Sequence, residues 1–111
     1  MKDDKVYIAQ ILDSIKKLKS FTVEMDREKF GLDEKTQSAV IMQLLLIGEV
    51  SKKISPEVKS GIDLPWQEIA GFRNAAIHNY FEIDLDIVWE TLISDIPVLE
   101  KTLLKNHDIK K

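Results

Sequence analysis

A single segment, from Asp33 to about Ile54, most constrains the fold of this chain. Its apolar residues cover nearly the whole circumference of a helix: Ala39, Val40, Ile41, Met42, Leu44, Leu45, Leu46, Ile47, Val50 and Ile54. A helix that is apolar on most sides is buried on most sides, so we predict the central helix of a bundle or a dimer-forming helix, with Asp33 as its N-cap. Gly48 lowers helix propensity by roughly 1 kcal/mol relative to alanine, which indicates a close approach by another backbone. Glu49 beside it needs a partner if it is buried.

The segments on both sides of this helix also show helical signals. Residues 4–20 place apolar side chains three and four positions apart, which predicts an amphipathic helix. We interpret residues 21–32 as the end of that helix and a connection. Ser55 followed by Pro56 is typical of the start of a short helix, which Gly61 would end.

The C-terminal half contains two more predicted helices. One has Pro65 in the first-turn position that helices favour and continues for about four turns to Phe81. The other is capped by Asp84 and runs to about Lys105. Pro97 should kink or divide it, because proline removes one hydrogen bond and clashes with the preceding turn. Since no strand pattern or repeat is present, the sequence predicts an all-α bundle.

Composition limits the classes of function. The length of 111 residues indicates one domain, and we expect its tail from about residue 106 to be loose. The net charge of −3 and the pI of about 5.4 argue against a broad basic surface for nucleic acid, so any contact with RNA must use a local cluster of positive charge. The absence of cysteine excludes disulfides, thiolate metal ligands and a cysteine nucleophile. With no signal peptide and no apolar run long enough to span a bilayer, we expect a cytoplasmic protein.

Four polar residues lie close together in the predicted helix that ends at Phe81. They are Arg73, Asn74, His78 and Tyr80, separated by small or apolar residues. On a helix Asn74 and His78 would share a face, while Arg73 and His78 would be offset by roughly 140° and about 7.5 Å along the axis. A single helix therefore cannot easily direct both Arg73 and His78 at one phosphate. Two such helices across a two-fold axis would bring both pairs into a shared cleft, which favours a dimeric site.

These residue types suit cleavage of RNA without a metal ion. A histidine can take the proton from a ribose 2′-OH or protonate the leaving oxygen. An arginine can stabilise the extra negative charge on the phosphate in the transition state, and Asn74 can orient the phosphate or the imidazole. We identify no metal site, because His78 and His107 are the only histidines and no carboxylate pair stands at ligand spacing. These residue types alone do not establish catalysis. An arginine and an asparagine exposed on the surface, beside a partly buried histidine, would show the same pattern without a catalytic role.

The pattern Arg73-x4-His78-x-Tyr80 resembles the signature of HEPN domains, specifically that of the HepT-like toxin subfamily. Residues 47–50, Ile-Gly-Glu-Val, resemble the Ile-Gly-Glu-Ala segment of that subfamily, and residues 65–74 resemble its Pro-Trp-Arg-Glu-Ile-Ala-Gly-Met-Arg-Asn. An Arg-x4-His pair alone is a weak signal, but the combined set is specific. The resemblance covers essentially the whole chain, and it implies a HEPN-type bundle of four to five helices that dimerises.

The resemblance also implies an activity, a regulator and roles for residues. HepT-like proteins are dimeric ribonucleases and the toxins of toxin–antitoxin pairs. Their partner is a small MntA-like nucleotidyltransferase, which transfers AMP from ATP onto the motif tyrosine. Carried over to this chain, Arg73 and His78 are catalytic, Tyr80 accepts the AMP, and Asn74 supports the site. Glu49 would orient the arginine from the neighbouring helix, and no cofactor of the chain's own is implied.

We therefore expect a metal-independent endoribonuclease that acts as a homodimer on tRNA or mRNA and leaves a 2′,3′-cyclic phosphate. The alternative is a non-catalytic helical module that docks on and regulates a nucleotidyltransferase. The acidic pI favours this alternative slightly, whereas the intact Arg73 and His78 pair favours the enzyme, because docking needs neither residue. A nucleotide-binding domain is discounted, since the chain has no Gly-rich phosphate loop.

Overall fold

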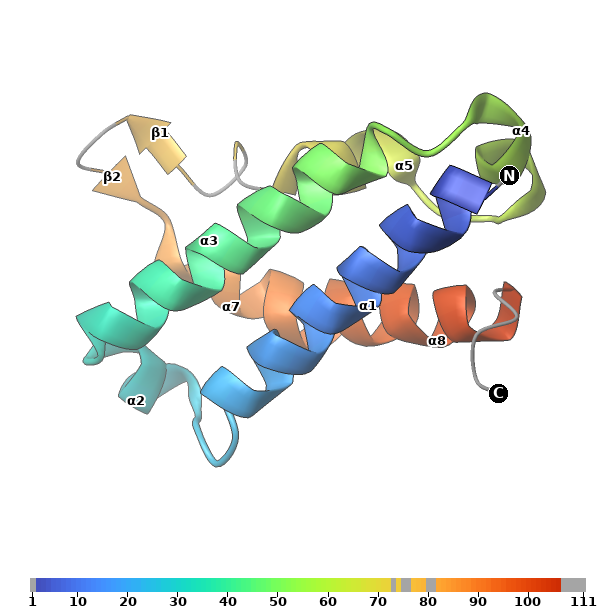
Figure 1. Ribbon diagram of the computed structural model, residues 1–111. Coiled ribbons are helices and arrows are strands. Elements are labelled where there is room, and N and C mark those ends of the chain that lie inside the picture. The colour runs from blue at the N-terminus through green and yellow to red at the C-terminus, as the bar shows by residue number, and fades with distance from the viewer. Residues whose placement is uncertain (1, 73, 75–76, 80–81, 107–111) are drawn as a thin grey trace.

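The long apolar segment forms the central helix of the structure. In this computed structural model, which describes residues 2–72, 74, 77–79 and 82–106 (the backbone alone at 2 and 77–79), helix α3 runs Glu34–Ser51. Asp33 caps α3 as predicted, and its carboxylate accepts a hydrogen bond from the Thr36 N–H at 3.0 Å. Helix α1 (Lys2–Phe21) lies beside α3 (Figure 1). Both helices contribute to one buried core: Ile8, Ile11, Ile15 and Leu18 from α1, and Val40, Leu44 and Ile47 from α3.

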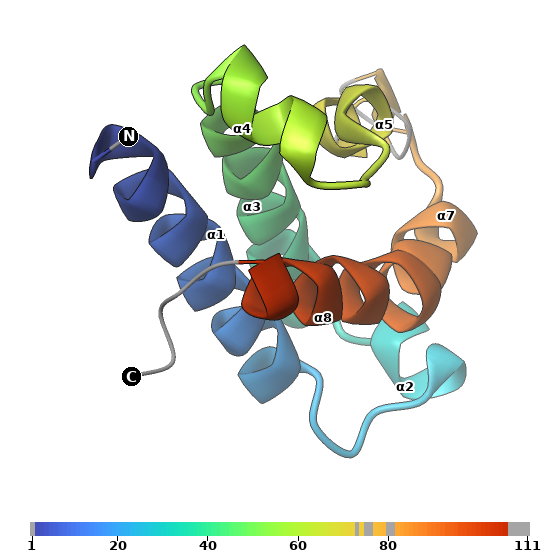
Figure 2. The same cartoon turned by 90° about the vertical axis from the view of Figure 1, so that its right-hand side faces the viewer.

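A second layer crosses α1 and α3 on one side (Figure 2). It consists of α7 (Leu85–Glu90), the π-helical turn η1 (Thr91–Asp95) and α8 (Ile96–Asn106), with Asp84 as the predicted cap of α7. Pro97, which has no N–H, is the second residue of α8, just after the widened turn. The prediction that the last helix is interrupted near this proline is therefore confirmed. In the described part of the chain, no helix is long and apolar enough to cross a membrane.

Two short helices complete the scaffold. Helix α4 (Pro56–Gly61) begins and ends as predicted, and the Ser55 hydroxyl accepts a hydrogen bond from the Val58 N–H. Helix α2 (Arg27–Gly31) lies within the segment that we predicted to be only a helix end and a connection. Its five residues are too few to show helical periodicity in the sequence. The helix is stabilised by its Asp26 cap and by the buried Phe30, whose ring centroid lies 5.4 Å from that of Trp89.

Asp4 connects the start of α1 to the start of α4. Its buried carboxylate accepts hydrogen bonds from both the backbone N–H and the hydroxyl of Ser55, each at 2.8 Å. The hydrogen bond from the backbone N–H, and to a lesser extent the one from the hydroxyl, hold the pKa of Asp4 below its usual value. The chain is thereby fixed where it leaves α3 and turns toward the second layer.

The predicted four-turn helix from Pro65 to Phe81 is wrong. Helix α5 (Trp66–Ala70) has only five residues and is followed by Gly71. Strand β1 (Ile77–Asn79) then pairs antiparallel with β2 (Glu82–Ile83), so a small hairpin replaces the second half of the predicted helix (Figure 1). Isoleucine, histidine and asparagine are all mediocre helix formers, and the pairing with β2 depends on residues beyond the predicted helix. The all-α class is nevertheless confirmed, because the strands are only two and three residues long.

Candidate active site

The structure places the predicted site residues on different elements. Glu49 lies on α3, Asn74 is an exposed residue in a helical conformation after α5, and the backbone of His78 belongs to β1. Arg73 and Tyr80 lie outside the described residues. Because β1 is a strand, the predicted stacking of Asn74 and His78 on one helical face is wrong. The predicted offset of Arg73 from His78 involves a residue outside the described part of the chain.

Gly48 positions the chain that leads into the motif. A Cβ atom on this residue would lie 2.8 Å from the carbonyl oxygen of Ala70 and 3.1 Å from that of Ile69. Only glycine permits this contact without a shift of one backbone, so the predicted close approach is confirmed. The Ser51 hydroxyl donates a buried hydrogen bond of 2.7 Å to the Gly48 carbonyl oxygen. The end of α5, three residues before Arg73, is thus held directly against the backbone of α3.

Trp66 holds the other end of α5. Its indole N–H donates to the carbonyl oxygens of Lys59 and Ile62, each at 3.1 Å, at the C-terminal end of α4. Ile69 and Phe72 are buried in the common core. The segment before Arg73 is therefore anchored by a side-chain hydrogen bond at its start, by apolar packing along its length and by the Gly48 contact at its end.

Glu49 is neither buried nor unpaired. Its carboxylate is about half exposed and accepts a hydrogen bond from the Lys52 ammonium at 3.1 Å. An exposed ion pair of this kind contributes little to stability and exchanges partners easily. That Glu49 orients Arg73 stays a prediction, which would require the carboxylate to exchange Lys52 for the guanidinium.

A small acidic cleft lies between α5 and η1–α8. It has a volume of about 120 Å³ and is lined by Leu64, Pro65, Glu68, Ile69, Phe72, Asp95, Val98 and Leu99. Partial burial raises the pKa of the Asp95 carboxyl, and the nearby carboxylates of Glu68 and Glu90 raise it further. Within the described residues no cation pairs with Glu68 or Asp95. The acidic side chains of this cleft disfavour the binding of a phosphate group there.

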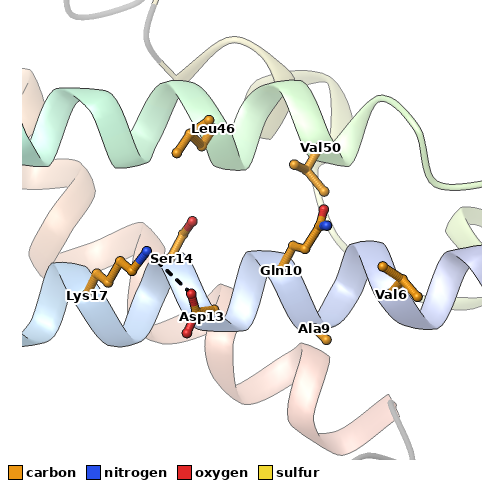
Figure 3. A pocket seen from close by; sticks show the side chains of 8 residues that line it. All are labelled: Val6, Ala9, Gln10, Asp13, Ser14, Lys17, Leu46 and Val50. Atoms are coloured by element: carbon orange, nitrogen blue, oxygen red, sulfur yellow. Dashed lines mark ion pairs between the residues drawn. The ribbon is translucent and has the colours of Figure 1, made fainter.

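Glu68 and Asp95 belong to segments that only the fold brings together, so no signal in the sequence predicts this cleft. The same is true of a larger groove of about 530 Å³ between α1 and α3 (Figure 3). No three histidine, cysteine or acidic side chains in the described part of the chain gather as metal ligands would.

Comparison with known proteins assigns the chain to a family. The family model described as "Ribonuclease HepT-like" matches residues 11–105. The chain belongs to the HepT-like ribonuclease family. All five predicted site residues of this HepT-like protein lie inside the matched range, and its helical architecture is that of the HEPN type.

Several named proteins are similar to this HepT-like chain. It is 41% identical over 97 residues to "Probable ribonuclease HepT" of Thermococcus cleftensis, across 86% of this chain and 88% of the relative. It is 35% identical to "Putative RNase TTE0752" of Caldanaerobacter subterraneus subsp. tengcongensis, across 91% of each chain. It is also 35% identical to "Gamma-glutamylcyclotransferase and putative RNase MJ0434" of Methanocaldococcus jannaschii, but covers only 47% of that protein. No solved structure matches the chain.

Proposed function

We propose that this HepT-like protein is a metal-independent endoribonuclease that cleaves tRNA or mRNA in the cytoplasm, as a homodimer and as the toxin of a toxin–antitoxin pair. The observation that carries the proposal is the presence of Arg73 and His78 at the motif spacing in a chain that belongs to the HepT-like ribonucleases. The relatives are named as ribonucleases across nearly the same length.

The proposed reaction is a transfer of the phosphodiester within the RNA. The ribose 2′-oxygen attacks the adjacent phosphorus, the bond from phosphorus to the 5′-oxygen breaks, and a 2′,3′-cyclic phosphate forms. His78 takes the proton of the 2′-OH as general base, and an imidazolium gives a proton to the leaving 5′-oxygen. In a homodimer the histidines of two protomers can divide these two tasks.

Arg73 is proposed to stabilise the transition state. Its guanidinium would bind the non-bridging phosphate oxygens, whose negative charge increases as the phosphorus becomes five-coordinate. The net charge of −3 and the acidic cleft beside α5 mean that RNA is held by a few local contacts. Asn74, which is exposed, would add a hydrogen bond to the phosphate.

A cleavage assay with the purified protein tests this function. We expect the wild type to cut purified tRNA or mRNA in the presence of excess EDTA, at a rate within about twofold of the rate without EDTA, and to leave 2′,3′-cyclic phosphate ends. The ends are identified by their resistance to a ligase that needs a 3′-hydroxyl, a resistance that is lost only after the cyclic phosphate is opened and the resulting monophosphate is removed. Loss of cleavage on metal removal, or products that carry 3′-hydroxyl ends, would contradict the proposed chemistry.

Tyr80 is the proposed site of inhibition by a MntA-like nucleotidyltransferase. Its hydroxyl oxygen would attack the α-phosphate of ATP, so that pyrophosphate leaves and AMP stays on the tyrosine. Tyr80 is two residues from His78 and directly follows β1, so the added phosphate would place negative charge where the RNA backbone has to bind.

Replacement of Tyr80 with phenylalanine is expected to remove this regulation. After incubation with the partner and ATP, the wild type should gain the mass of one AMP and lose RNA cleavage, whereas Tyr80→Phe should gain no mass and keep its cleavage. Tyr7→Phe is the matched control, because Tyr7 is the other tyrosine of the chain and lies on α1. Transfer of AMP to Tyr80→Phe would show that a different residue accepts it.

A further inference from the structure

We propose that Lys52 and Lys59, two lysines on one side of α5, bind the phosphate backbone of the RNA next to the motif. We call them the lysine pair. The inference rests on the proposed function and adds to it a subsite for the substrate, together with the side from which the RNA strand reaches Arg73. The lysine pair belongs to the part of the molecule where α4 and α5 lie next to each other beside the C-terminal end of α3 (Figure 2).

Lys59 is tied to the start of α5. Its ammonium lies 5.9 Å from the centre of the Trp66 ring, and its carbonyl oxygen accepts a hydrogen bond of 3.1 Å from the indole N–H of the same tryptophan. In the described part of the chain no carboxylate forms an ion pair with this ammonium. A lysine over an aromatic face keeps its charge but loses some of its conformational freedom. Its N–H donors can therefore bind an anion at a lower entropic cost.

Lys52 lies beside the other end of α5. It follows Gly48 by one turn on the same side of α3, and a Cβ on Gly48 would lie 2.8 Å from the carbonyl oxygen of Ala70, the last residue of α5. The side chain of Lys52 is 54% exposed, and its ion pair with Glu49 is exposed as well. Such a pair is weak, so a phosphate can take the place of the carboxylate. The exchange of partners that would let Glu49 orient Arg73 would also free Lys52.

The opposite side of α5 is acidic. Glu68 is two residues from both Trp66 and Ala70, so on a helix it points about 160° away from each of them. It lines the small cleft together with Asp95, and neither carboxylate pairs with a cation within the described residues. A phosphate is repelled on this side and attracted on the side of the lysine pair. The RNA strand is therefore expected to pass α5 on the side of α3 and α4.

The lysine pair is close enough to the motif to share one RNA strand with it. α5 spans about 7.5 Å, and Arg73 follows its last residue by three positions, which is at most about 11 Å of chain. A strand of a few nucleotides that is held by Arg73 therefore reaches both lysines. Glu57 and Asp63, the acidic residues nearest to Lys59 in the sequence, form no ion pair with either lysine in the described part of the chain.

The dependence of RNA binding on salt tests the proposal. Binding is measured in the His78→Ala background, where the RNA stays intact, by fluorescence anisotropy of a labelled RNA that the wild type cleaves. One phosphate contact contributes about 0.7 to the slope of log Kd against log salt concentration for a single strand, which corresponds to about fivefold in Kd at about 0.1 M salt. We expect Lys52→Gln and Lys59→Gln each to raise Kd about fivefold and to lower this slope by about 0.7.

Lys53→Gln is the matched control. Lys53 follows Lys52 in the sequence, and its ammonium also lies 5.9 Å from the centre of an aromatic ring, but that ring belongs to Tyr7 of α1. The control removes the same charge and should change Kd by less than about twofold, because salt screens charges that make no contact. Lys59→Arg keeps the charge over Trp66 and should bind like the wild type, which separates a lost phosphate contact from a disturbed α5.

Cleavage provides a second measurement. With His78 present, Lys52→Gln and Lys59→Gln should raise KM and leave kcat at saturating RNA within about twofold, as expected for side chains that bind the substrate and take no part in the reaction. Losses in kcat at constant KM, an unchanged salt slope, or an equal loss of binding in Lys53→Gln would each overturn the inference. A wild type that cleaves RNA while the lysine variants bind and cleave equally well refutes the subsite alone, whereas a wild type that cleaves no RNA refutes the proposed function.

Discussion

Replacement of His78 with alanine is expected to lower the rate of RNA cleavage by about 10²–10⁴-fold, the range that a positioned general acid–base usually contributes. The fold should be kept, because β1 pairs with β2 through backbone groups that do not depend on the side chain at position 78. Single-turnover cleavage of a defined RNA measures the chemical step, and thermal unfolding measures the stability of the variant.

Neighbouring variants show whether the loss is specific to the proposed chemistry. Asn79→Ala is the matched control, because it changes the next residue of the same strand and leaves the signature intact. Arg73→Ala should lose activity on a similar scale, and Arg73→Lys should recover it only in part, since an ammonium keeps the charge but not the two-pronged hydrogen bonding of a guanidinium. If His78→Ala, Arg73→Ala and the wild type behave alike, the motif is not catalytic, and a docking module for a nucleotidyltransferase becomes the better account.

Replacement of Gly48 with alanine is expected to impair the enzyme without touching any reacting group. In a free helix this change would add roughly 1 kcal/mol of stability. Here the new Cβ would lie 2.8 Å from the Ala70 carbonyl oxygen, so either α3 or α5 has to move. Overpacking of this kind costs typically about 1–3 kcal/mol, so we expect a net loss of about 1 kcal/mol in the free energy of unfolding. A displaced α5 would also misplace Arg73, and cleavage should fall about tenfold or more.

Gly61 provides the matched control for this prediction. It ends α4, has no positive φ, and would meet no atom within 4 Å if a Cβ were added. Gly61→Ala should therefore leave both stability and cleavage intact or raise stability slightly. Chemical denaturation and the cleavage assay are run on both variants. Equal stability and equal activity of Gly48→Ala and Gly61→Ala would show that the contact between α3 and α5 does not position the site.

The local signals of the sequence identified most of the scaffold. Asp33, Ser55 and Asp84 each cap the helix that they were predicted to cap, because an N-cap needs only a side-chain oxygen and the N–H groups two or three residues later. Pro97 interrupts the last helix for an equally local reason. The buried residues of α1 and α3 recur three and four positions apart, as expected for the core side of a helix, whereas Met42 and Leu46 of α3 are exposed.

The approach of another backbone to Gly48 was also visible in the sequence, but the identity of that backbone was not. A glycine in an apolar helix indicates that space is needed, whereas only the fold shows that the end of α5 occupies it. The same limit applies to Glu49, whose apolar neighbours left its burial open, and whose carboxylate is exposed and bonded to Lys52. In a helix that is apolar around most of its circumference, the sequence does not reveal which side the rest of the chain will cover.

The sequence by itself determined the all-α class, the main helices with their caps, and the motif residues on which the proposed chemistry rests. The tertiary structure alone decided that α5 ends at Ala70, that His78 belongs to a strand, and that Glu68 and Asp95 share a cleft. The physical reason is the range of the interactions. Caps, prolines and periodicity act within one or two turns of the chain. The hairpin, the cleft and the contact at Gly48 instead form between segments that are brought together by folding. There, packing and strand pairing outweigh small differences in helix propensity.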